Sequence, residues 1–178
     1  MAKHPGRFKY SASVDPARAD ALDVLRNAIK GGATGFGEMK SRSKADSPEM
    51  KRVYELAAEL RVPVTIHFAD YGQFEGDTPY NEGITRFAAV LEAYPRTTLI
   101  GHADAFWANI SGDVPPTAYP SGPIKPGGIT DKLLSTYPNL YADMSANSCR
   151  NALARDPGFI REFLNRHQNK LMFGSDCS

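Results

Sequence analysis

Five polar side chains in this 178-residue chain directly follow short apolar segments, and two of the five are histidines. Imidazole and carboxylate groups together suit Zn²⁺ or a similar divalent ion. A carboxylate beside such an ion can also move protons during hydrolysis. Any one of them alone would be an ordinary polar residue at the end of a strand, but their repetition indicates a shared site. The five residues are Glu38, His67, His102, Asp143 and Asp176.

The apolar segments that precede these residues alternate with helical patterns along the chain. Most are apolar for much of their length, as parallel strands buried on both faces are. Six strands are predicted, over residues 8–14, 33–39, 62–68, 97–103, 140–145 and 171–175. Five helices are predicted between them, and Asp15-Pro16, Ser47-Pro48 and Asp156-Pro157 supply three of the helix starts.

The spacing of the strands indicates an α/β fold built from βα units. Strands begin about 33 residues apart, and eight such units would need about 260 residues, near the size of a (β/α)₈ barrel. We therefore expect residues 1–178 to form a single domain, a TIM-like barrel that is incomplete. It would hold six parallel strands with outer helices and lack the first two βα units and the last helix. The carboxyl ends of its strands should converge on one face.

Composition argues against several classes of protein. Lys and Arg total 21 against 20 for Asp and Glu, so no nucleic-acid partner is expected. No segment approaches the roughly 20 apolar residues of a membrane helix, and no signal peptide is evident. Two cysteines are too few for a disulfide scaffold and fit a reducing compartment, so a cytoplasmic location is expected. An oligomer is left open.

The order of the motifs resembles the amidohydrolase superfamily, especially its amidohydrolase-related (amidohydrolase 2) branch, which also contains nonoxidative decarboxylases. One strand ends in His67, a Leu-Ile-Gly-His strand ends in His102, and a Phe-Gly-Ser-Asp strand ends in Asp176. The segment from Pro5 to Pro16 resembles the family's third strand and the turn after it. The resemblance thus spans nearly the whole chain, as strands three to eight of the barrel.

The resemblance implies a distorted barrel that binds one or two divalent metals, of which zinc is the expected one. His67 matches a metal-binding histidine, and His102 matches one that binds a second metal or polarises the reacting group. Asp176 matches a metal ligand that is also the general base. Glu38 matches a position where many members carry a bridging lysine or glutamate, and Lys40 has the same strand parity and is the alternative there.

The chain departs from the family pattern at the first strand. The family supplies a His-x-His pair there, and this sequence contains none. The pair would lie upstream of Met1, so we expect a fragment with weak metal binding and little activity by itself.

Two long segments that follow the histidine strands, residues 68–80 and 104–126, are expected to contact a substrate. Trp107 lies in the second of them, and Arg150 follows the next strand, where it could bind a substrate carboxylate. These two are the candidate substrate-binding residues. A tryptophan that packs on the barrel rim and a plain surface arginine are the alternatives.

Together these observations predict a metal-dependent hydrolase of the amidohydrolase-related type that acts on a small molecule. A metal-activated water would attack an amide, ester or lactone carbonyl, with Asp176 and His102 as the catalytic residues. Glu38, His67, His102 and Asp176 are the candidate metal ligands. Two alternatives stay open: a decarboxylase on the same scaffold, which would protonate a substrate carbon, and an inactive fragment.

Overall fold

The computed structural model describes residues 6–70, 78–114 and 117–176. Its strands form one parallel sheet of six, in the sequence order β1 to β6. The predicted α/β architecture with strands in chain order is confirmed. The strands β1 to β6 are, in turn, Ser11–Ala12, Gly35–Met39, Val64–His67, Leu99–His102, Leu140–Asp143 and Leu171–Met172.

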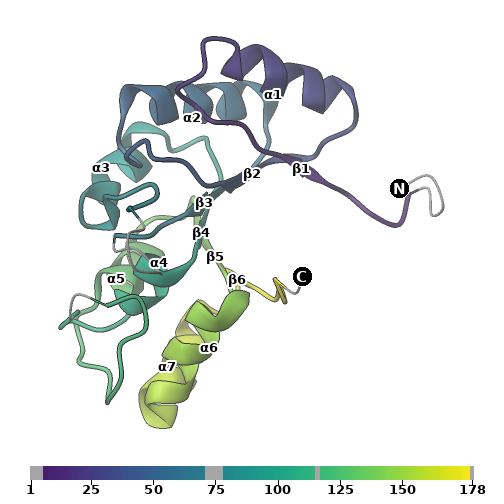
Figure 1. Ribbon diagram of the computed structural model, residues 1–178. Helices are drawn as coiled ribbons and strands as arrows, with labels where there is room; N and C mark the ends of the chain where they lie inside the picture. Colours follow the sequence, from purple (N-terminus) through teal and green to yellow (C-terminus); the bar gives the residue numbers. More distant parts are fainter. Residues whose placement is uncertain (1–5, 71–77, 115–116, 177–178) are drawn as a thin grey trace.

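The sheet is curved and open, and the helices lie on its convex face (Figure 1). Within the described residues, β1 pairs only with β2 and β6 pairs only with β5. The concave face is turned toward the side where both termini lie (Figure 1). The prediction of an incomplete barrel with outer helices is therefore confirmed.

The helical layer contains longer helices and two short elements. Two of the predicted helix starts are confirmed by capping bonds, because Ser47 accepts the Met50 N–H at 3.3 Å and Asp156 accepts the Phe159 N–H at 3.0 Å. The helices are α1 Ala21–Lys30, α2 Pro48–Leu60, η1 Ile84–Arg86, α3 Phe87–Ala93, α4 Asp104–Ala108, α5 Ile129–Thr136, α6 Ala146–Arg155 and α7 Pro157–His167.

Three helices differ from the prediction, because α1 begins later than expected and α4 and α6 lie where no helix was predicted. The first helix begins at Ala21 instead of next to Asp15, because the Asp15 carboxylate accepts the N–H of Ala17 at 3.0 Å and its carbonyl accepts that of Arg18 at 3.1 Å. These two bonds form a turn that delays the helix. Helix α6 was not predicted, since its start has no side-chain cap and it buries only Ser148, Cys149 and Ala152.

The core lies between the sheet and the helices and fixes the ends of the strands. Phe36, Ile66 and Leu99 from three neighbouring strands are fully or almost fully buried there. The aromatic rings of Phe68 and Phe106 stack just beyond β3 and β4, with centroids 6.2 Å apart. Within the described residues, no helix has the length and apolar character needed to cross a bilayer.

Gly101 in β4 allows close packing beside His102. A Cβ at Gly101 would lie 2.0 Å from Cε2 of the fully buried Phe106. Gly101→Ala is therefore expected to lower the free energy of unfolding by about 1–3 kcal/mol, measured by urea denaturation. Gly158→Ala in α7 is the control, because its nearest heavy atom would lie at 3.5 Å and alanine favours a helix. Equal stability of both variants would contradict this packing.

Candidate metal centre

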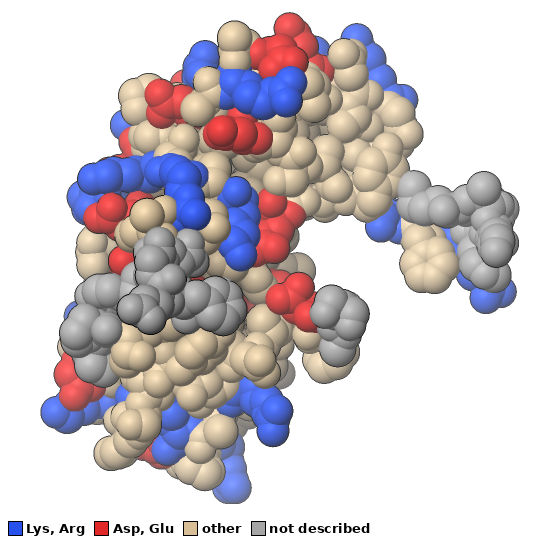
Figure 2. Space-filling view, viewed as in Figure 1, with Lys and Arg blue, Asp and Glu red and all other residues tan. Residues whose placement is uncertain are grey.

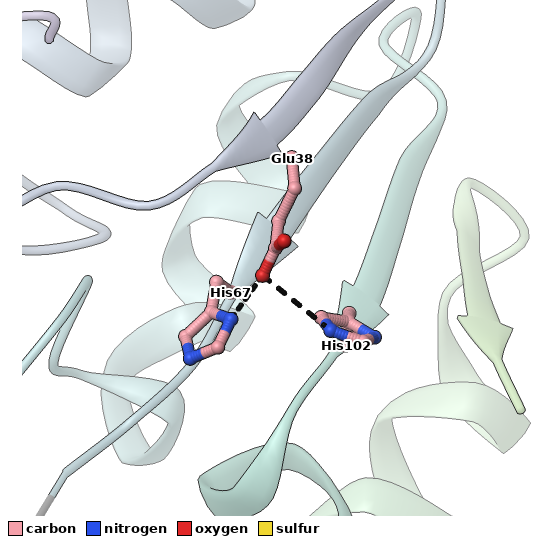
Figure 3. Close-up of side chains that lie close together, drawn as sticks. All are labelled: Glu38, His67 and His102. Atoms are coloured by element: carbon pink, nitrogen blue, oxygen red, sulfur yellow. Dashed lines mark hydrogen bonds and ion pairs between the residues drawn. The ribbon is translucent and has the colours of Figure 1, made fainter. Parts of the chain in front are cut away.

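The carboxyl ends of β2, β3 and β4 bring three potential metal ligands together. Glu38, His67 and His102 each offer one ligand atom, and these atoms lie within 4.8 Å of one another. His67 and His102 are register partners on neighbouring parallel strands, and their ring centroids are 5.5 Å apart. Figure 3 shows the Glu38 carboxylate pointing between the two rings. The expected convergence of these three side chains therefore occurs.

The Glu38 carboxylate contacts both histidines through the same oxygen. Its Oε1 contacts Nδ1 of His67 and lies 3.4 Å from Nε2 of His102 (Figure 3). Two ligand atoms bound to one tetrahedral Zn²⁺ at about 2.0–2.1 Å lie about 3.3 Å apart. Both imidazoles are buried, whereas the Glu38 side chain keeps 36% exposure. The cluster thus has a solvent-facing side through which an ion can enter.

The donor set fits a divalent metal such as zinc. It combines two imidazoles with a carboxylate, the ligand types of many zinc and other transition-metal sites. The Nε2 atom of His67 is buried and has no hydrogen-bond partner within the described part of the chain. This is the ring nitrogen that does not contact Glu38, and a buried polar atom without a partner is costly unless a ligand reaches it.

A second layer of hydrogen bonds fixes the orientation of His102. Its Nδ1 donates to Asp143 Oδ2 at 3.0 Å, which leaves Nε2 directed toward Glu38. The hydroxyl of Ser145 donates to the same Asp143 oxygen at 2.6 Å. The indole N–H of Trp107 donates to the backbone carbonyl of Asp143 at 3.0 Å. Metal-binding histidines commonly hold a carboxylate on the second nitrogen in this way.

In the cluster, attraction between opposite charges outweighs the effect of burial on the pKa values of Glu38 and His102. Burial raises the pKa of the Glu38 carboxyl, but its bond to His67 and the nearby imidazole charges outweigh this and hold that pKa below its usual value. Burial lowers the pKa of His102, but the bond to Asp143 and the charges of Glu38, Asp143 and Asp176 raise it above its usual value. The carboxylates around His102 therefore favour a positive charge at this position, carried either by a proton or by a metal ion.

A pocket of about 240 Å³ opens beside the cluster at the carboxyl ends of the strands. Asp176, which follows β6, lines this pocket together with Glu38 and His102. Its side chain is exposed, and it is not one of the three clustered ligands. The remaining lining residues are Thr65, Asp143, Ser145 and Gly174.

The two candidate substrate-binding residues lie away from this pocket. Trp107 is 1% exposed and packs in the core against Phe106 and Phe163, with ring centroids 5.6 and 6.3 Å away. Arg150 is exposed on α6 and lines a separate pocket of about 560 Å³ that also includes Phe173. The structure therefore places Trp107 behind the site, where it supports Asp143, and Arg150 beside a different cavity.

Sequence reasoning identified Asp143 at a strand end but gave it no role, and it missed Ser145. The signal for Asp143 was present, because it ends β5 as His102 ends β4. Its partner could not be chosen from the sequence, since the two residues are far apart along the chain. Ser145 carries no pattern that separates it from an ordinary loop serine.

No family model and no curated protein sequence matches this chain. Solved structures do resemble it. An uncharacterised TIM-barrel protein from Bordetella bronchiseptica matches with a TM-score of 0.64 and 16% identity, over 98% of this chain and 56% of that one. The 2,6-dihydroxybenzoate decarboxylase from Rhizobium matches with a TM-score of 0.50 and 17% identity, over 98% of this chain and 62% of the decarboxylase. Dihydroorotase from Campylobacter jejuni matches with a TM-score of 0.51 and 16% identity, over 96% and 50%.

These similarities show the fold of the chain. It covers 50 to 62% of the length of these three proteins, which agrees with a partial barrel. They confirm the expected incomplete TIM-like barrel as the fold.

Replacing the partner of His102 tests the second layer. Asp143→Asn removes the charge and is expected to weaken zinc binding by about 10- to 100-fold. Because protons compete with metal for His102, zinc affinity should fall as the pH decreases through the raised pKa of this histidine. Without the Asp143 charge that pKa drops, so the fall should move to lower pH. Zinc titrations at a series of pH values measure both effects.

The control for this experiment is Asp113→Asn, which removes a carboxylate that is paired with Lys125 and 51% exposed. The zinc affinity of Asp113→Asn, and the way this affinity changes with pH, should equal those of the unmodified protein. An Asp143→Asn variant that also behaves like the unmodified protein would show that the second layer does not act on the metal.

Proposed function

We propose that this chain forms the metal-binding and catalytic side of a metal-dependent hydrolase of the amidohydrolase type. The observation that carries the proposal is the cluster of Glu38, His67 and His102 at the carboxyl ends of adjacent strands. In parallel barrels this end of the sheet is where catalysis takes place. The structural neighbours named as dihydroorotase and as a decarboxylase add that this fold supports enzymes.

Glu38, His67 and His102 would hold the metal, and zinc is the expected ion for this donor set. A bound divalent ion would polarise a scissile carbonyl and lower the pKa of a bound water toward about 7. Asp143 and Ser145 keep the His102 ring in one orientation throughout. The buried faces of the two imidazoles exclude bulk water from one side of the site.

Asp176 is the proposed general base. Its carboxylate lines the same pocket as Glu38 and His102 and is exposed, so it can reach a water molecule there. It would accept the proton of the attacking water and pass it to the leaving nitrogen or oxygen. A pocket of about 240 Å³ admits a small acyl group, which fits an amide, ester or lactone substrate.

A nonoxidative decarboxylase is the second candidate. It is favoured by the similarity in fold to 2,6-dihydroxybenzoate decarboxylase. The same pocket would then bind a carboxylic acid, and an acidic group such as protonated Asp176 would deliver a proton to the substrate carbon. Release of CO₂ instead of a hydrolysis product distinguishes the two reactions.

Replacing the proposed carboxylate ligand Glu38 tests whether the cluster binds a metal. Glu38→Gln is expected to lower zinc affinity at least about 10-fold, because an amide is a much weaker ligand than a carboxylate. Glu49→Gln on α2 is the matched control, and it should leave zinc affinity unchanged. Equilibrium dialysis with zinc gives both the affinity and the stoichiometry. Equal zinc affinity in the two variants would remove the basis for a metal centre at Glu38.

The proposed base is tested by Asp176→Asn in the zinc-loaded protein. The substitution keeps the size of the side chain but removes its proton acceptor, so the turnover of the zinc-loaded chain, which we expect to be low from the start, should fall further by about 10²- to 10⁴-fold. Hydrolysis of a panel of small amides, esters and lactones is measured, with release of CO₂ from aromatic acids in parallel. Circular dichroism checks that the fold is retained. Unchanged turnover would exclude Asp176 as the base.

A further inference from the structure

We propose that Lys40 forms an anion-binding position beside the candidate metal centre, and that the substrate therefore carries a carboxylate near the reacting group. The identity of the reaction rests on the proposed function, whereas the anion-binding position can be tested without it. Neither the sequence motifs nor the structural neighbours assign this role to Lys40.

The position of Lys40 follows from the strand that carries Glu38. Lys40 lies two residues after Glu38 at the end of β2, so the two side chains leave the strand on the same face. Its ammonium lies over the ring of Tyr80, 4.8 Å from the centroid. The Tyr80 ring in turn packs against the ring of His67 at an interplanar angle of 78°, with centroids 5.9 Å apart. One aromatic ring thus connects the ammonium to the metal cluster.

The Tyr80 ring is held in place from several sides. The Arg42 guanidinium stacks on it at 3.8 Å from the centroid and donates to the Tyr80 hydroxyl at 2.9 Å. The backbone of Tyr80 exchanges two hydrogen bonds of 2.9 Å with Ala69, just beyond β3. A fixed aromatic surface of this kind orients a lysine by cation–π attraction while leaving its three N–H donors available.

Lys40 differs from two nearby basic residues in that they form ion pairs with carboxylates. Lys44 pairs with Glu82 at 3.9 Å, and Arg86 pairs with Asp46 at 2.8 Å. Within the part of the chain that the structure describes, Lys40 forms no such ion pair, and its charge acts on Glu38 only at longer range. Figure 2 shows basic and acidic surface side by side where the molecule is hollowed.

This arrangement favours a substrate with a carboxylate at a defined distance from the reacting group. The negative cluster would hold the metal, which takes the polar reacting group, while the ammonium of Lys40 attracts an anion beside it. A neutral substrate would leave that ammonium without an anionic partner. Arg150, the residue that the sequence favoured for this task, lines another pocket, whereas Lys40 lies over the Tyr80 ring that packs on His67.

The test compares binding of benzoate with that of its neutral analogue benzamide, by NMR titration of chelator-treated and of zinc-loaded protein. We expect benzoate to bind about 3- to 5-fold more tightly than benzamide in both states, the size expected for a partly exposed ion pair. The preference should decrease with added salt. In Lys40→Gln the affinity for benzoate should fall to that for benzamide, whereas Lys40→Arg should keep the preference. Lys51→Gln, an exposed lysine on α2, is the matched control and should also keep it.

The outcomes separate the two proposals. If zinc does not bind but Lys40→Gln removes the benzoate preference, the metal-dependent function is wrong and the anion-binding position stands. If benzoate binds only to the zinc-loaded protein and Lys40→Gln has no effect, the carboxylate binds the metal and the anion-binding position is wrong. It is equally overturned if benzoate does not bind, if benzamide binds as tightly, or if Lys51→Gln causes the same loss.

Discussion

The parallel register between β3 and β4 is the constraint on which the candidate site depends. It places His67 opposite His102, so both imidazoles reach the same face at the carboxyl ends of their strands. A slip of one residue would turn one ring toward the helices, because successive side chains of a strand point to opposite faces. Buried Ile66 and the absence of a side chain at Gly101 help to fix this register, since Phe106 occupies the space behind Gly101.

The same register brings the two buried imidazoles close to ionised carboxylates. Two imidazoles in a nearly dry environment would favour their neutral forms, yet Glu38 and Asp143 stand on either side of His102 and favour its protonated form. A protonated histidine and a divalent metal are alternative ways to balance the same carboxylates. In the proposed metal centre a divalent cation would replace that proton, which would couple metal binding to pH.

The sequence predicted the features that periodicity and strand ends encode. Strand order, outer helices and the meeting of Glu38, His67 and His102 all follow from the rule that parallel strands expose their carboxyl ends on one face. Features that depend on long-range packing could not be predicted. Trp107 lies in a segment that reads as a loop, and only the packed structure shows that it is buried and bonds to Asp143. Helix α6 buries only the small side chains of Ser148, Cys149 and Ala152 and has no side-chain cap, so no strong helical pattern marks it.

The contact between Lys40 and Tyr80 is the basis of the anion-binding position proposed beside the metal centre. Glu38 and Lys40 share a face of the same strand end, but the first turns to the histidines and the second rests on an aromatic ring. The ammonium of Lys40 and the carboxylate of Glu38 therefore do not form a direct ion pair, because the first rests on the Tyr80 ring and the second contacts the histidines. If both proposals hold, a metal would bind at one end of the site and an anion at the other. A ligand with a polarised carbonyl and a carboxylate would then match both ends at once.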